Sequence, residues 1–219
     1  IMFEPSVGNK ILNSIAQTQD NLEVVFNSSV KKIDNKKGNW EVTLDSNSDL
    51  PKVTSKILID ATELGDLIPI LNIPYSIGMD SNSQFAEKIA PLKSNNIIQD
   101  LTYVMILKDY GKDVTINEPL NYNREEFLCS YDSKECFNSD LKLWSKENLI
   151  SYGKLPNGKI MINWPIYGND YYVNSIEMNE SEREFHYEKA KQKSLRFLYF
   201  IQTELNYNNL SIDKQEFLT

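Results

Sequence analysis

Apolar positions near the start of the chain change from helical spacing to alternation. After Glu4-Pro5-Ser6 they recur at helical spacing, at Val7, Ile11, Leu12 and Ile15. This spacing predicts an amphipathic helix that begins there. LEVVF (22–26) is rich in strand-forming residues and predicts a strand. SVKKID and WEVTLD then flank residues 35–39, whose composition is typical of a hairpin loop.

The next segment, KVTSKILIDAT (52–62), predicts a returning strand. Its first half alternates, whereas Ile57-Leu58-Ile59 is continuously apolar, as in a strand that becomes buried on both faces. The strand is expected to end at Asp60-Ala61-Thr62 and to be followed by a short helical turn over 67–71. Residues 78–96 are polar and predict irregular structure.

The remainder of the chain mixes strands, loops and one long helix. QDLTYVMILKDY (99–110) and KIMINWPIY (159–167) predict strands, the second bent or ended at Pro165. Residues 111–150 lack periodicity and predict loops with short helices. Residues 180–205 predict an amphipathic helix with Ser181 as its N-cap. The pattern as a whole favours an α/β or α+β fold.

Composition and charge narrow the classes of partner. The chain has 219 residues, 41% of them hydrophobic and 25% charged, which is ordinary for a globular protein. Its net charge of −8 disfavours nucleic-acid binding, because an acidic surface repels phosphate backbones. No apolar run is long enough to span a membrane. We therefore expect neither a nucleic-acid nor a membrane partner, while the oligomeric state and the compartment are not predicted.

The residues suited to metal binding or nucleophilic catalysis are few. The two cysteines, Cys129 and Cys136, match no zinc-binding pattern, and we favour two unpaired thiols over a disulfide. The single histidine, His186, lies in the predicted long helix, so a histidine-rich metal site is excluded. Neither a Walker loop nor G-x-G-x-x-G occurs. No metal site is expected, and no catalytic residue is assigned.

DATELGD (60–66) is the first candidate site. Asp60, Glu63 and Asp66 recur every three residues, but a metal would need further ligands nearby. A phosphate or ribose neighbour suits the motif better, because Ala61 and Thr62 are small and Gly65 allows a turn with positive φ. A plain cap between a strand and a short helix remains an alternative.

The second candidate site is NWPIYGNDYY (163–172), where aromatic and amide side chains surround a proline and a glycine. Such a loop suits flat or sugar-like ligands, which it would bind by stacking and by amide hydrogen bonds. The candidate substrate-binding residues are Asn163, Trp164, Tyr167, Asn169 and Asp170. An aromatic strand end that packs against a neighbouring domain is an equally good interpretation.

Several collinear segments resemble a bacterial family of FAD-dependent oxidoreductases, some of which carry a xanthan-lyase-like label. They are KILIDATELGDLIPILNIPYSIG, IQDLTYVMILKDY, LPNGKIMINWPIYGNDYY and FLYFIQTEL, and the resemblance extends over about residues 3–219. The first part of the chain is similar to the wider flavoprotein superfamily that includes p-hydroxybenzoate hydroxylase.

The resemblance implies FAD as cofactor and a set of residues beside it. Val30 would hold the adenine ring through its main chain. The strand-end motif, Asp60, Ala61, Thr62, Gly65 and Asp66, would lie along the cofactor at the carboxyl edge of the sheet. Glu63 stands where many members of the superfamily have glycine.

The resemblance also implies the domain organisation. Residues 1–66 would be part of a FAD-binding Rossmann-like domain with a β-meander. Residues 67–205 would be an inserted mixed-sheet substrate domain, and 206–219 the start of the return to the cofactor domain. The glycine-rich phosphate loop and the C-terminal return would lie outside the chain, so we expect an internal fragment that binds FAD weakly or not at all by itself.

The expected function is hydride transfer between FAD and an unidentified small molecule. The alternative is a non-enzymatic module that binds carbohydrate or protein, with the aromatic loop as its binding face.

Overall fold

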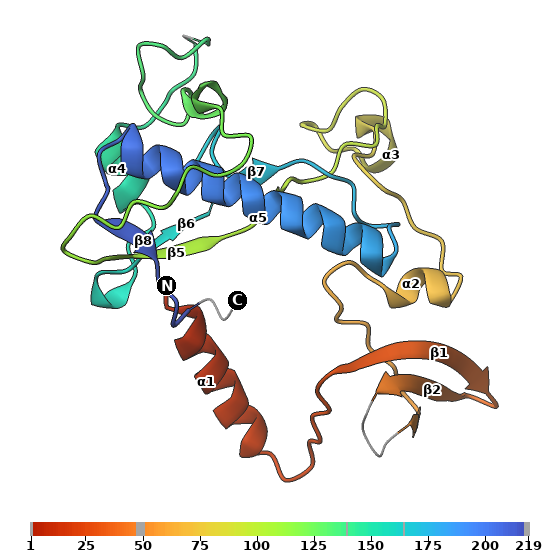
Figure 1. The fold of residues 1–219 in the computed structure, drawn as a ribbon. Helices are drawn as coiled ribbons and strands as arrows, with labels where there is room; N and C mark the ends of the chain where they lie inside the picture. The colour runs from red at the N-terminus through yellow and green to blue at the C-terminus, as the bar shows by residue number, and fades with distance from the viewer. Residues whose placement is uncertain (1, 47–50, 139, 164, 217–219) are drawn as a thin grey trace. The chain divides into compact units, whose positions relative to one another are not determined.

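The computed structural model of the chain is an α+β structure of helices and small antiparallel sheets (Figure 1). It describes residues 2–46, 51–138, 140–163 and 165–216. The chain forms two compact units, which are described separately below. One comprises residues 1–14 and 99–219, and the other residues 15–98. The domain boundaries expected at 66 and 205 separate a cofactor-binding region from a substrate-binding region. The division into compact units does not show which residues bind cofactor or substrate, so these boundaries stay a prediction.

The predicted first helix is confirmed as α1, Pro5–Gln17, but its apolar face is not covered. No residue of α1 is buried, and Ile11, Leu12 and Ile15 are all more than half exposed. The helix start is nevertheless held firmly. The buried Glu4 accepts a hydrogen bond from Asn157 Nδ2 at 2.6 Å, and the Glu4 carbonyl accepts the amides of Val7 and Gly8.

The unit of residues 15–98 contains the predicted β-meander. Strands β1 (Ser28–Lys36), β2 (Asn39–Ser46) and β3 (Lys52–Ser55) form one antiparallel sheet in that order. The hairpin closes at the pair Lys36 and Asn39, where Gly38 has φ +83°. The strand predicted at 22–26 is wrong. This segment pairs with no strand in the described chain, and Phe26 is 68% exposed.

The predicted strand over 52–62 is only partly formed. β3 ends at Ser55, and residues 56–62 have no strand partner among the described residues. Ile57 and Ile59, expected to be buried on both faces, are 76% and 79% exposed. Burial on both faces requires covering layers on each side of the sheet, and the described chain supplies none here. Beyond it, the predicted helical turn is confirmed as α2, Leu67–Ile70.

The rest of this unit is largely irregular, as predicted for residues 78–96. It contains the short helix α3, Asn82–Phe85, and a β-bridge between Met79 and Asn95. α2 packs against β1, and Leu67 is buried.

The unit of residues 1–14 and 99–219 is built on a sheet of order β6-β5-β8 and a two-stranded ribbon, β4-β7. The strand predicted over 99–110 is present as β4 (Leu101–Thr102) and β5 (Met105–Asp109), and that over 159–167 as the shorter β6 (Ile160–Ile162). β7 spans Asp170–Tyr171 and β8 Leu210–Ile212. The described residues of 111–150 are loops around the 3₁₀ turn η1 (Arg124–Phe127) and α4 (Lys146–Ser151), as predicted. A second 3₁₀ turn, η2, spans Pro156–Gly158.

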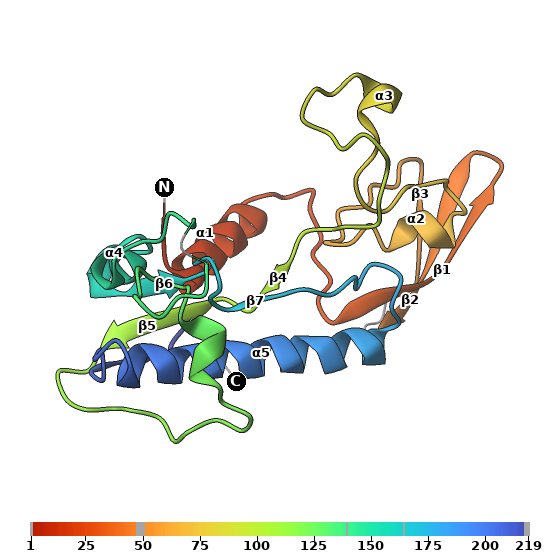
Figure 2. The ribbon, with the colours of Figure 1, turned by 90° about the horizontal axis from the view of Figure 1, so that it is seen from above.

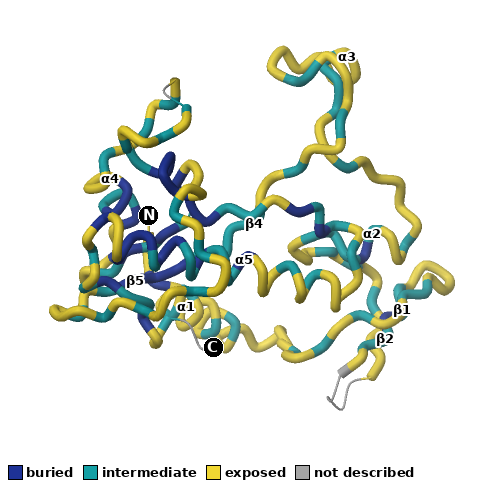
Figure 3. The backbone as a smooth tube through the Cα atoms, turned by 45° about the horizontal axis from the view of Figure 1, so that its top comes forward, coloured by how far each residue is buried: buried dark blue, intermediate teal, exposed yellow. Residues whose placement is uncertain are grey.

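The long helix, α5 (Glu180–Thr203), lies along these strands (Figure 2). Its N-cap is Asn179 rather than the predicted Ser181. Asn179 and Glu182 exchange side-chain and backbone hydrogen bonds in a capping box, which an N-cap at Ser181 would not allow. Buried residues of α5 begin at Ala190, so only the C-terminal half of the helix joins the core (Figure 3).

The core of this unit joins that half of α5 to the sheet, η1 and α4. Phe127 of η1 packs on Phe197 and Phe200 of α5, with ring centroids 5.2 and 5.5 Å apart. The expectation of two unpaired thiols is wrong, because Cys129 and Cys136 form a disulfide that closes the loop after η1. In the described part of the chain, no helix has the length and apolar character needed to cross a membrane.

Candidate functional site

The bend at residues 60–66 is held together by its own side chains. Asp60 Oδ1 accepts hydrogen bonds from the amide and the hydroxyl of Thr62, at 2.9 and 2.7 Å, and Asp60 Oδ2 accepts the amide of Leu67. Thr62 Oγ1 in turn accepts the amide of Asp66 at 2.7 Å. These bonds lower the pKa of Asp60, first through the Thr62 amide. Asp60 therefore caps the first residue of α2, as the alternative interpretation expects, although no strand is formed directly before the bend.

The same hydrogen bonds leave one side of the bend open. The amides of Glu63, Leu64 and Gly65 take part in no hydrogen bond within the described chain, and Ala61 is exposed. Gly65 has φ +69°, as its role in a turn predicts, and a Cβ there would lie 2.9 Å from Ile68 Cδ1. The bend thus offers adjacent donors and little side-chain bulk to a ligand.

Val30, the other predicted cofactor residue, lies in β1 opposite Leu44, where the pairing shifts by one residue before Lys32. It belongs to the same compact unit as residues 60–66.

The predicted substrate residues contribute to a polar groove in the other unit. Asn163 and Asp170 line it together with Gln99, Asp100 and Thr102, and its volume is about 620 Å³. The pairing of β4 with β7 creates this site, because it sets Thr102 opposite Asp170. The volume lies in the range of small-molecule sites.

Asp170 is the most perturbed group in the groove. Burial raises its pKa, Thr102 lowers it by donating a hydroxyl hydrogen bond, and the nearby charge of Asp100 raises it further. Its main-chain oxygen accepts a hydrogen bond from Lys193 Nζ of α5, which fixes the strand against the helix. A carboxyl group with a raised pKa beside a groove is suited to proton transfer.

The other predicted substrate residues have different surroundings. Asn169 is fully buried, and its Nδ2 donates to the carbonyl of Tyr103 and to Ser194 Oγ, at 3.1 and 3.3 Å. It therefore ties the segment just before β7 to α5 rather than lining the groove. Tyr167 has φ +51° and packs edge-to-face on Phe137, with centroids 5.3 Å apart. Trp164 lies outside the described residues.

Sequence reasoning missed Gln99, Asp100 and Thr102 as groove residues. They lie at the start of the predicted strand 99–110. A polar strand end is the one feature of the sequence there that could have indicated a binding site. Their convergence with Asp170 depends on a pairing across 68 residues, which no local pattern specifies.

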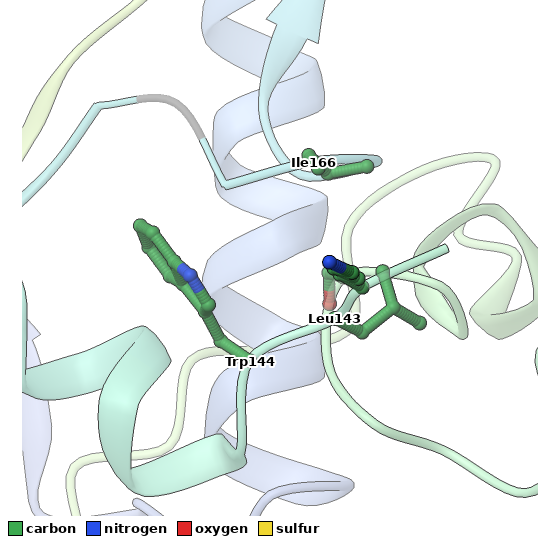
Figure 4. A pocket seen from close by; sticks show the side chains of 5 residues that line it. Leu143, Trp144 and Ile166 are labelled. Carbon is green, nitrogen blue, oxygen red and sulfur yellow. The ribbon is translucent and has the colours of Figure 1, made fainter. Parts of the chain in front are cut away.

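A smaller pocket lies beside Trp144 (Figure 4). Leu143 and Trp144, from the segment before α4, and Ile166, from the segment before β7, surround it. Ser130 Oγ, buried without a hydrogen-bond partner, also lines it, and its volume is about 80 Å³. This volume suits a small apolar group and is far below that of a typical ligand site.

The family model described as FAD dependent oxidoreductase matches residues 1–217. The chain belongs to the FAD-dependent oxidoreductase family. No curated protein and no solved structure matches it.

FAD is the cofactor of this family of oxidoreductases, and the bend at 60–66 is compatible with such a ligand. The open amides of Glu63, Leu64 and Gly65 can donate to its polar atoms, and glycine permits the positive φ of this turn next to the Ile68 side chain. The carboxylate of Asp60 does not oppose this, because the hydrogen bonds that it accepts disperse its charge. Among the described residues, no three His, Cys, Asp or Glu side chains converge as a metal site would require.

Proposed function

We propose that this chain forms part of a flavin oxidoreductase that removes a hydride from a small hydroxylated molecule. The observation that carries the proposal is the family match, which extends over nearly the whole chain rather than over one motif. Bound FAD supplies the hydride acceptor, and the residues of the chain supply binding, orientation and proton transfer.

On the cofactor side, we assign Val30, Asp60, Ala61, Thr62, Gly65 and Asp66 to FAD binding. The support is the open side of the bend, with its three available amides and its glycine at positive φ. Asp60 and Thr62 act indirectly in this assignment, since their hydrogen bonds hold the bend in shape before any ligand arrives.

The exposed apolar segment before the bend supports the expected Rossmann-like sheet. Ile57 and Ile59 are strand-forming residues that the described chain leaves uncovered. In this proposal, they belong to a central strand whose neighbours and covering helices come from further residues of a longer protein. The proposal therefore includes that this chain is part of a longer protein.

On the substrate side, we assign the groove around Asp170. In this proposal, Asn163 and Thr102 hydrogen-bond a hydroxylated substrate and Asp170 accepts the hydroxyl proton; the support is that all three line one groove. Burial keeps the pKa of Asp170 above its usual value, which makes this carboxylate a better base than an exposed aspartate.

The test is flavin reduction in the full-length protein purified with its cofactor. A panel of sugars and polyols is added without oxygen, and loss of the flavin absorption band is followed. We expect at least one compound to bleach the band, and Asp170→Asn to slow bleaching about a hundredfold or more at unchanged FAD content. A purified protein without flavin would favour the non-enzymatic module, and unchanged rates in Asp170→Asn would remove that residue from the mechanism.

A further inference from the structure

A second groove lies between α5 and the loop that leads into η1. Its volume is about 370 Å³, and its walls include Asn121 and Glu126 on one side and Lys189, Gln192 and Arg196 on the other. The packing of η1 against α5 positions the two walls (Figure 2). Of its described lining residues, Tyr171 alone lies in the segment 163–172, and the proposed oxidoreductase site uses none of them.

Arg196 is a largely buried cation whose charge is only weakly paired. Its side chain is only 18% exposed, and its Nε is buried without a hydrogen-bond partner. The nearest carboxylate oxygen, Glu126 Oε2, is 3.9 Å from that nitrogen, which is beyond hydrogen-bond distance. Burying a charged group is costly unless it is paired and hydrogen-bonded. The guanidinium therefore has donor capacity that the described chain does not use.

A second cation extends the positive side of the groove. Lys189 precedes Arg196 by two helical turns, so both side chains lie on one face of α5, with Gln192 between them. Lys189 is exposed and has no ion pair in the described residues; its ammonium group lies 4.8 Å from the Phe185 ring centroid. The whole chain has a net charge of −8, yet this face of α5 carries two cations with little ion pairing.

The neutral wall residues are hydrogen-bonding groups. The Asn121 side chain has no partner in the described chain, and the Tyr171 hydroxyl lies 2.9 Å from His186 Nδ1. Tyr171 follows Asp170 in β7, and successive strand residues point to opposite faces. The groove at Arg196 is therefore separate from the groove at Asp170, as their different linings show.

We propose that this second groove binds an oxyanion, a carboxylate or phosphate group carried by a small polar molecule. The Arg196 guanidinium would donate to two oxygens of the anion, as its planar fork favours, and Lys189 would add a point charge. Glu126 also lines this groove, and its negative charge would repel the anion and weaken its binding. The site requires neither bound FAD nor the proposed hydride transfer.

The experiment is a titration of the full-length protein, at constant ionic strength, with inorganic phosphate in one arm and acetate in the other. Binding is measured by calorimetry and by NMR shifts. Saturable binding in either arm supports the site and identifies the preferred anion. No saturation in both arms overturns it.

Variants place the binding in the groove. Arg196→Gln should weaken it about tenfold or more and Lys189→Gln about threefold, whereas Glu126→Gln should tighten it. Lys112→Gln removes the same charge at an exposed position outside the groove and should change little. Equal affinities in Arg196→Gln and Lys112→Gln would overturn the proposal. If Arg196→Gln does not fold, unchanged binding in both Lys189→Gln and Glu126→Gln would do so.

Discussion

Lys159 joins two buried carboxylates, and its removal should be one of the most damaging single changes in this unit. Its Nζ lies 2.7 Å from Glu216 Oε1, in a hydrogen bond, and 2.9 Å from Asp213 Oδ2, in an ion pair without hydrogen-bond geometry. The Asp213 and Glu216 side chains are 0% and 1% exposed. In Lys159→Met, both carboxylates would remain buried without this cation.

The magnitude follows from what remains after the change. Removing one partner of a buried ion pair costs about 3–5 kcal/mol. Asp213 Oδ1 would keep Lys108 Nζ at 3.4 Å, and Glu216 would keep two hydrogen bonds from Ser6. We therefore expect the lower end, a loss of about 3 kcal/mol in the free energy of unfolding. For a chain of this size, the melting temperature should fall by roughly 6–12 °C.

Urea and thermal unfolding, followed by circular dichroism, measure this loss. Lys214→Met changes a nearby exposed lysine and is the matched control. A loss below about 1 kcal/mol, or one equal to that of the control, would refute the reasoning, because the buried carboxylates would then not depend on Lys159.

The pH dependence provides a further check. Burial is the largest single influence on Asp213 and Glu216 and by itself would raise both pKa values. The hydrogen bond and charge of Lys159, together with bonds from Gln215 and Ser6 and the charge of Lys108, outweigh burial and lower both pKa values. A lowered folded-state pKa gives stability that is present above the unfolded value, about 4, and lost as the pH falls through the folded value. The acid-side loss of stability should therefore be smaller in Lys159→Met than in the wild type.

Three other changes test the remaining structure. Because burial raises the pKa of Asp170, the folded state binds its proton more tightly, and stability falls as pH rises from about 4 through the folded value. Asp170→Asn should thus be more stable than the wild type at pH 7 and equal to it near pH 3, and a less stable variant at pH 7 would contradict this. Replacing Cys129 and Cys136 together by serine should cost about 2–3 kcal/mol, as expected for closing so short a loop, and a reductant should change the unfolding of the wild type alone. Asn179→Ala should cost about 1 kcal/mol through the lost cap of α5, against less than about 0.5 for Ser181→Ala; the reverse order in urea unfolding would restore Ser181 as the cap.

Local sequence patterns predicted most of the helices and strands, including two strands whose partners lie far along the chain. The hairpin of β1 and β2, the helices α1 and α5, and the strands at Met105–Asp109 and Ile160–Ile162 all follow from spacing and turn residues. The N-cap of α5 was displaced by two residues, because the reciprocal bonds of Asn179 and Glu182 outweigh a serine followed by acids.

The wrong predictions concern contacts with residues that are distant in the sequence or that the described chain does not supply. The apolar run at Ile57 is strand-like, but a strand forms only where partners supply hydrogen bonds, and the described chain has none there. The groove at Asp170 depends on pairing with Thr102, and the disulfide on a loop conformation, and neither leaves a local signal. The motif singles out Asp60, but its hydrogen bonds to Thr62 depend on a backbone conformation that the motif alone does not specify.

The central claim is that the bend at 60–66 lies along FAD, and the FAD content of Gly65→Val in the full-length protein tests it most directly. The control is Gly38→Val, since Gly38 also has positive φ but sits in the β1–β2 hairpin with open space around it. Both variants share the backbone strain of a positive φ, but Gly65→Val adds bulk at the bend and also brings its Cβ to 2.9 Å from Ile68 Cδ1. Urea unfolding of both variants therefore accompanies the FAD measurement, so that a loss of FAD is separated from a loss of stability. The account predicts that Gly65→Val loses most of its FAD while folded and that Gly38→Val retains it; equal FAD content in the two folded variants would contradict it.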